Sequence, residues 1–152
     1  MTAAAYARTD LEPMYLPVGN MLQIDRAISV DDHAIVCEMD VPPSHWVFAL
    51  HFPGDPIYPG CLQVEAAGQV VAIWAWHNGL RGTPRLARVS AEFEQPIRPQ
   101  PQPVVFSARI RHRRHICLGT VEVKVGGVRA ATVELALAIV PDGPNGNGDP
   151  RP

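Results

Sequence analysis

The hydrophobic positions of this chain follow two patterns, one that alternates along the chain and one that covers every face of a helix. Alternation dominates the second half, for example in the segment VEVKV at residues 121–125. Together with many β-branched residues, this alternation predicts strands. The predicted strands cover residues 86–97, 104–114, 116–125 and 128–140. Gly126 and Gly127, between the last two, predict a two-residue hairpin turn.

The second pattern lies in the middle of the chain. The segment CLQVEAAGQVVAIWAWHN, residues 61–78, is apolar on nearly every face, which predicts a buried helix. At 1.5 Å per residue such a helix would extend ~27 Å, about the width of a small domain. Asn78 and Gly79 tolerate the left-handed backbone that ends helices, so we place the end of the helix there.

The first half of the chain is less regular. Residues 21–30 and 34–41 are predicted strands, joined by a turn at residues 31–33. A proline-rich stretch over residues 42–60 then leads to the helix. Two strands, a long buried helix and four more strands predict an α+β fold, in which an antiparallel β-sheet wraps around a central α-helix.

This pattern predicts one domain over residues 11–140. Residues 1–10 are expected to form a flexible N-terminal arm. Residues 141–152 are rich in Pro, Gly, Asn and Asp without an apolar anchor, so we expect a disordered tail.

Composition narrows the class of protein. The 152 residues suit one domain, and a formal net charge of -2 gives no overall attraction to nucleic acid or to an anionic membrane. Cys37, Cys61 and Cys117 lack the spacing of disulfides or zinc sites, and the histidines show no ligand spacing, so we expect no metal. The N-terminus lacks a signal peptide's apolar core, and no apolar stretch reaches the ~20 residues of a membrane span. A soluble, cytoplasmic protein is therefore expected.

The segment HFPGDPIYPGCLQVEAAGQ carries the candidate chemistry. Gly60 and Cys61 begin the predicted helix, where free N–H groups and the helix dipole suit an oxygen that gains negative charge. Glu65, on an otherwise apolar helix, is expected to be partly protonated near neutral pH and thus a proton donor. Gln69 lies four residues further, on the same face, and could bond the carboxyl group. His51, before a loop stiffened by prolines, is the candidate base.

Each of these residues also has a purely structural interpretation. A histidine before a proline-rich loop is commonly a surface or capping residue. A glutamate in an apolar helix is commonly paired with an arginine. Trp74 and Trp76 are either core residues or the lining of a tunnel. The spacing alone does not decide between these interpretations.

The same segment resembles the active-site motif of the bacterial 3-hydroxyacyl-acyl-carrier-protein dehydratases, the FabA/FabZ family of the hot-dog fold. His, Phe, Gly, Pro, Pro-Gly, Leu, an acid, Ala and Gln occur in the family's order, and the fourteen-residue separation of His51 and Glu65 is kept. The resemblance extends more weakly through LQIDRAISV, FEQPIRPQ and RHRRHICLGTVEVKVGGVRAATVELALAI. It implies the same arrangement of a helix inside a sheet.

The resemblance implies a hydro-lyase that removes water from a 3-hydroxyacyl thioester on the phosphopantetheine arm of acyl carrier protein, in fatty-acid or polyketide/polyene biosynthesis. His51 would remove the α-proton, Glu65 would donate to the leaving β-hydroxyl, and the N–H groups of Gly60 and Cys61 would hold the thioester oxygen. Gln69 would support Glu65, and no cofactor or metal is needed. In this family the active sites form between subunits, which implies a homodimer with His51 facing the partner's helix.

The chain combines features of two branches of that family. GDPIYPGCL resembles the FabA branch, which also isomerises trans-2 to cis-3 double bonds. Pro53 and Glu65 instead resemble the FabZ branch, which mostly only dehydrates, so isomerase activity stays open. Trp46 and Leu50 occupy positions that are usually more polar, which suggests a specialised substrate.

Two rival functions and one surface feature stay open. A hot-dog acyl thioesterase would also use a helix-borne carboxylate beside a helix start, but it would not need His51. A non-catalytic subunit would bind carrier protein while a homologue in a heterodimer does the chemistry. Arg109, Arg111 and Arg113 alternate and so share one strand face, which is either a solvated face or a docking patch for an acidic carrier protein.

Overall fold

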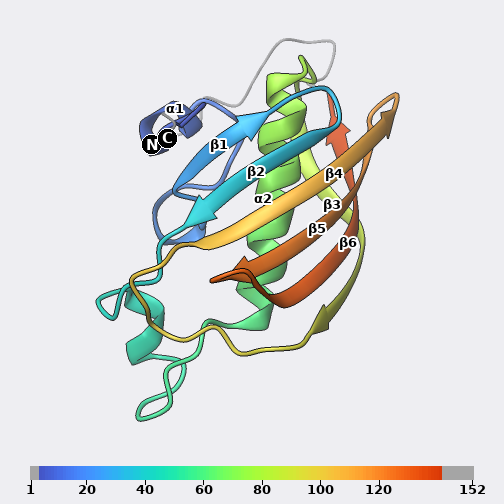
Figure 1. The fold of residues 1–152 in the computed structure, drawn as a ribbon. Coiled ribbons are helices and arrows are strands. Elements are labelled where there is room, and N and C mark those ends of the chain that lie inside the picture. The colour runs from blue at the N-terminus through green and yellow to red at the C-terminus, as the bar shows by residue number, and fades with distance from the viewer. Residues whose placement is uncertain (1–3, 142–152) are drawn as a thin grey trace.

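An antiparallel sheet of six strands curls around one long helix in the computed structural model, which describes residues 4–141 (Figure 1). The elements are α1 (Arg8–Leu11), β1 (Arg26–Val30), β2 (Ala34–Met39), α2 (Gly60–His77), β3 (Thr83–Phe93), β4 (Val104–Arg113), β5 (Ile116–Val125) and β6 (Val128–Val140). The strands lie in the order β1-β2-β4-β5-β6-β3, and all neighbours are antiparallel. The predicted α+β architecture, with the sheet wrapped around the central helix, is confirmed.

The alternation along the strands separates a face on the helix from a face on solvent. In β5 the side chains of Val121 and Val123 are buried, whereas that of Thr120 is exposed. An antiparallel sheet with one covered face requires this pattern. Helix α2 is buried along most of its surface, but one stripe that includes Val64, Glu65 and Gly68 is only partly covered.

Local signals set the turns and the end of the helix. Gly79 has a φ of +84°, its N–H donates to Trp76, and the Leu80 N–H donates to Ala75. These two bonds form a Schellman motif and end α2 where it was predicted to end. Gly126 and Gly127 both have positive φ and form the predicted hairpin turn between β5 and β6.

The predicted turn before β2 is stabilised by an aspartate side chain. The Asp31 carboxylate accepts hydrogen bonds from the N–H groups of His33 and Ala34, each at 2.8 Å. These bonds hold the pKa of Asp31 below its ordinary value.

Some strand boundaries differ from the predicted ones, and both a local turn and a contact distant in sequence contribute. Strand β1 begins at Arg26 rather than residue 21, because residues 19–21 form a 3₁₀ turn. Strand β3 ends at Phe93 rather than residue 97, because the N–H groups of Glu94 and Gln95 both converge on the carbonyl of Ala130.

The segment expected to be an N-terminal arm is described from Ala4 onward. Tyr6 exchanges two backbone hydrogen bonds with Ala27 of β1, at 3.1 and 3.0 Å, and α1 ends in the fully buried Leu11. The expected C-terminal tail, residues 141–152, lies outside the described residues except for Pro141.

Candidate active site

The start of α2 presents backbone N–H groups without helical acceptors. Pro59 is the N-cap residue, and the N–H groups of Leu62 and Gln63 both donate to its carbonyl at 3.1 Å. The N–H groups of Gly60 and Cys61 precede the first N–H that donates within the helix, so no helical carbonyl accepts from them. Together with the helix dipole they can stabilise an oxygen that gains negative charge.

Gly60 also has a packing partner that the sequence did not indicate. A Cβ atom at this position would lie 3.1 Å from two ring carbons of Phe93, at the end of β3. The missing side chain therefore lets the edge strand approach the helix start closely. Packing of the Phe93 ring thus gives a reason for a glycine here besides access to the N–H groups.

Glu65 and Gln69 lie together one turn into α2, as predicted. The Gln69 side-chain amide donates to the Glu65 carboxylate at 3.0 Å and to the Met21 carbonyl at 2.8 Å. Gln69 is 3% exposed, and Glu65 is half-buried. Among residues 4–141 no arginine pairs with Glu65, so the structural interpretation of that residue finds no support there.

His51 lies in the loop that extends past the start of α2. Its ring nitrogen Nδ1 is 3.0 Å from the carbonyl oxygen of Ile57, and its ring stacks on Phe52 at 3.9 Å between centroids. Because a carbonyl only accepts, Nδ1 must carry a proton and donate. In the neutral ring Nε2 then keeps its lone pair and can act as a base. Within the described chain no hydrogen bond joins His51 to Glu65 of the same subunit.

Two buried polar residues near these groups were missed. Tyr58, in the same loop as His51, is 2% exposed and donates its hydroxyl hydrogen to the side-chain oxygen of Gln23. The backbone N–H of Gln23 in turn donates to Gln69 at 2.8 Å. A weak signal was present, since Gln23 interrupts an otherwise apolar run before Asp25.

The two tryptophans of α2, Trp74 and Trp76, lie near the far end of the helix. Trp74 is almost fully buried, and its indole N–H donates to the Asp31 carbonyl at 3.0 Å. Trp76 carries the guanidinium of Arg81 over its ring, 3.6 Å from the centroid. At 1.5 Å per residue Trp74 is ~21 Å from Gly60, so its contacts are those of a core residue.

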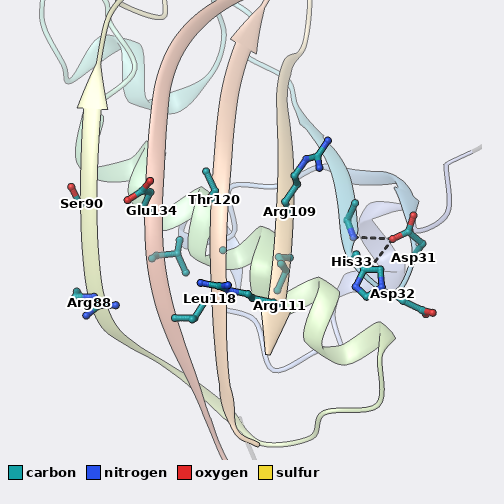
Figure 2. Close-up of a pocket in the computed structure, with 14 residues that line it drawn as sticks. Asp31, Asp32, His33, Arg88, Ser90, Arg109, Arg111, Leu118, Thr120 and Glu134 are labelled. Carbon is teal, nitrogen blue, oxygen red and sulfur yellow. Dashed lines mark hydrogen bonds between the residues drawn. The ribbon is translucent and has the colours of Figure 1, made fainter. Parts of the chain in front are cut away.

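A groove of about 1000 Å³ lies on the solvent face of the sheet, opposite α2 (Figure 2). Arg109 and Arg111 of β4 border it on one side and Arg88 of β3 on the other, and no ion pair among the described residues neutralises them. The three predicted β4 arginines therefore do share one face. This face is remote from the start of α2 in the same subunit, and neither His51 nor Glu65 lines the groove.

The described part of the chain offers neither a metal-binding cluster nor a membrane-spanning helix. No three His, Cys, Asp or Glu side chains of residues 4–141 gather closely enough to hold a metal ion. No helix in that range is both long and apolar enough to cross a bilayer.

The fold is shared with solved structures of low sequence identity. The dehydratase heterocomplex ApeI:P from Xenorhabdus doucetiae aligns with a TM-score of 0.69 and 18% identity, over 84% of this chain and 89% of that one. A mutant thioesterase from Pseudomonas aeruginosa aligns with a TM-score of 0.66 and 19% identity, over 91% and 96%. The PaaI protein of E. coli, from the phenylacetic acid degradation operon, gives 0.60 and 18%, over 74% and 80%.

A family model identifies the family of the chain, which structures of such low sequence identity do not show. The model of the FabA-like domain matches residues 16–134, which include every candidate site residue. Because this match covers well over half of the sequence, the chain belongs to the FabA-like domain family, as its resemblance to the FabA/FabZ dehydratases predicted.

Proposed function

We propose that this protein is a dehydratase that converts a 3-hydroxyacyl thioester, carried on the phosphopantetheine arm of acyl carrier protein, into a trans-2-enoyl thioester and water. The observation that carries the proposal is the orientation of the His51 ring. Its Nδ1–H is bound to the Ile57 carbonyl at 3.0 Å, which leaves Nε2 as the base. The FabA-like family and the similar dehydratase fold support the same reaction class.

The residues divide the reaction between a base, an acid and an anion site. His51 Nε2 takes the α-proton, and the electron pair of that C–H bond moves towards the thioester carbonyl, whose oxygen is held by the N–H groups of Gly60 and Cys61. The pair then forms the C=C bond as the β C–O bond breaks, and Glu65 protonates the leaving hydroxyl to give water. Positioned acid–base groups contribute about 10²–10⁴-fold and one oxyanion donor about 10²–10³-fold.

An exposed apolar edge of the sheet supports a site shared between two subunits. Strand β3 is an edge of the sheet, and the helix side of this strand carries the exposed apolar residues Leu86, Val89 and Phe93. A long, exposed apolar edge is suited to pairing with another chain. We propose that two β3 strands pair antiparallel about a two-fold axis. A homologue in place of the second copy would give a heterodimer.

Such a pair would also bring the arginines near a site. The start of β3 lies at the same end of the sheet as Arg111 and Arg113 of β4, whereas the end of β3 contacts Gly60. Antiparallel pairing of β3 places the arginine end of one subunit beside the Gly60 end of the other. The arginine face is then a candidate docking surface for the acidic surface of a carrier protein, with an affinity that falls as salt rises.

The reaction is tested by intact-mass analysis of acyl carrier protein loaded with short and medium 3-hydroxyacyl groups. We expect the wild type to remove one water, and both His51→Ala and Glu65→Gln to be slower by at least about 10²-fold. His115→Ala and Glu12→Gln, at exposed positions, are the matched controls. Loss of the whole acyl group, insensitive to His51→Ala, would indicate a thioesterase. No change with any chain length would indicate a non-catalytic subunit. Chromatography separates trans-2 from cis-3 products of equal mass.

The shared site is tested by mixing the two inactive variants. After unfolding and refolding together, His51→Ala and Glu65→Gln subunits form mixed dimers in half of the pairs. In a mixed dimer with shared sites, one site carries both substitutions and the other carries none. We therefore expect activity to recover to about a quarter of the wild-type value. No recovery, in dimers shown to have mixed, would place each site within one subunit.

A further inference from the structure

A chain of buried hydrogen bonds joins Glu65 to the backbone before β1. The Gln69 side-chain oxygen accepts from the N–H groups of Gln23 and Ile24, at 2.8 and 3.4 Å. Its side-chain nitrogen donates to the Met21 carbonyl and to Glu65. With donors at one end and acceptors at the other, the amide has a single favourable orientation. Gln69 can therefore present an N–H to Glu65 only while the backbone of residues 21–24 keeps its place.

Gln23 holds that backbone. Its side-chain nitrogen donates to the carbonyls of Asn20 and Met21 at 2.8 and 2.9 Å, closing the 3₁₀ turn of residues 19–21 from inside. The side chain is 3% exposed, and its oxygen accepts the hydroxyl hydrogen of Tyr58. Every polar atom of the Gln23 side chain is thus engaged.

Tyr58 connects this arrangement to the base. It follows Ile57, whose carbonyl accepts from the His51 ring at 3.0 Å and whose N–H donates to the His51 carbonyl at 2.9 Å. Tyr58 also precedes Pro59, the N-cap of α2, and its own N–H donates to the Ile97 carbonyl at 2.8 Å. Burial raises the pKa of the Tyr58 phenol, so its hydroxyl stays a donor at physiological pH.

The choice of these residue types is not explained by packing alone. A phenylalanine and a methionine would fill nearly the same volume without burying a hydroxyl and an amide. Buried polar groups must recover the free energy of their desolvation through hydrogen bonds, so their net contribution to stability is small. What a fully satisfied network adds is a unique geometry, which each catalytic group needs in its own site.

We infer that Tyr58 and Gln23 are positioning residues: within one subunit they hold the Glu65 carboxylate, through Gln69, and the His51 loop, which serve the two different sites of the proposed dimer. The inference rests on the proposed function for its catalytic consequence. The side chains of Tyr58 and Gln23 hydrogen-bond neither to His51 or Glu65 nor to the N–H groups of Gly60 and Cys61. Three successive hydrogen bonds carry the connection, from Tyr58 to Gln23, from Gln23 to Gln69, and from Gln69 to Glu65.

The test compares Tyr58→Phe, Gln23→Met and the double variant. Tyr58→Phe leaves the side-chain oxygen of Gln23 without its donor, and Gln23→Met leaves the Tyr58 hydroxyl without its acceptor and the carbonyls of Asn20 and Met21 without the amide donor. Both should be less stable than the wild type, and the double variant should be more stable than Gln23→Met because it also removes the unsatisfied hydroxyl. The kcat of all three should fall about 10–100-fold, with KM within about twofold. Tyr6→Phe is the matched control, since its hydroxyl bonds the exposed His77.

A second readout does not depend on activity. The side-chain amide protons of Gln69 are both hydrogen-bonded, so their NMR signals should be well separated and slow to exchange with water. These signals are assigned by their loss in Gln69→Glu. In the double variant we expect the chemical shifts of the two protons to converge and both protons to exchange with water faster.

The outcomes distinguish positioning from packing. A stable double variant with low kcat, unchanged KM and altered Gln69 signals supports the inference. A double variant that regains wild-type kcat, or whose Gln69 signals do not move, overturns it. If the wild type dehydrates no thioester, the proposed function fails, and the Gln69 signals alone then decide whether Tyr58 and Gln23 position Glu65.

Discussion

Strand β5 meets helix α2 at Gly119, where we predict a strong coupling between two substitutions. A Cβ atom at Gly119 would lie 2.8 Å from Cγ2 of Val71. Carbon atoms in contact are ordinarily about 3.5–4.0 Å apart. Val71 is fully buried and β-branched, and a helix allows it essentially one rotamer, so it cannot turn away. Gly119→Ala must therefore separate strand and helix by roughly 0.7 Å or distort one of them.

The magnitude follows from opposing contributions. Overpacking costs about 1–3 kcal/mol, and the reduced entropy of the unfolded chain returns about 0.4–1 kcal/mol. Gly119→Ala should thus lower the free energy of unfolding by about 1–2 kcal/mol. Val71→Ala removes two methyl groups and should lower it by about 2 kcal/mol. In the double variant the new Cβ occupies the vacated space, so the total loss should be only about 1–2 kcal/mol, a coupling of about 2 kcal/mol.

Urea unfolding followed by tryptophan fluorescence and by circular dichroism measures these differences. For a chain of this size 1 kcal/mol corresponds to roughly 2–4 °C in Tm, which gives an independent check. Thr120→Ala, next to Gly119 but on the solvent face, should change the free energy of unfolding by less than about 0.5 kcal/mol. Losses for Gly119→Ala and Val71→Ala that add within about 0.5 kcal/mol would refute the close contact of β5 and α2 at this point.

Three further predictions concern thiols, a buried amide and pH. In the native protein only the exposed Cys61 should react quickly with a thiol reagent, because Cys37 and Cys117 are buried and burial raises the pKa of Cys117 to about 11. Equal rates of modification of the three cysteines, measured by mass spectrometry, would contradict this. The side-chain oxygen of Gln63 is buried without a hydrogen-bond partner among the described residues. Gln63→Leu should therefore raise the free energy of unfolding, measured by urea unfolding, by about 1–3 kcal/mol. A decrease would contradict the unpaired state of this oxygen. Burial lowers the pKa of His45, so as pH falls the unfolded chain takes up a proton at this residue before the folded chain does. The free energy of unfolding should therefore fall as pH drops below about 6.5 towards the folded pKa, and it should fall less in His45→Gln. Urea titrations from pH 7.5 to 5 measure both, and equal pH dependence of the two proteins would contradict the prediction.

The proposed chemistry was accessible from the sequence because its signals are local. A motif in which His51, Gly60 and Glu65 keep a fixed order needs no knowledge of distant contacts, and the pairing of Glu65 with Gln69 follows from helical periodicity alone. The packing reason for a glycine at position 60 was not accessible from the sequence, because the Phe93 ring that packs on Gly60 comes from the end of another strand.

For Arg109, Arg111 and Arg113 as well, the sequence predicted one feature and only the structure showed another. Their alternation was sufficient to place them on one face of β4, since successive side chains of a strand point to opposite sides. Their position relative to Glu65 was not accessible, because it depends on the strand order β4-β5-β6-β3 and on which sheet face meets the helix. Docking near the proposed active site would thus need the second subunit that we propose, which no local pattern indicates.

The sequence by itself determined the element types, the end of α2 at Asn78–Gly79, the β5–β6 turn and the order of the motif. Each of these depends on residues within a few positions of one another, where backbone preference and periodicity dominate. Only the tertiary structure decided that β3 is an edge and that Tyr58 and Gln23 meet. Contacts between residues 35 positions apart depend on long-range register, and the free energy that selects a register comes from packing of the whole core.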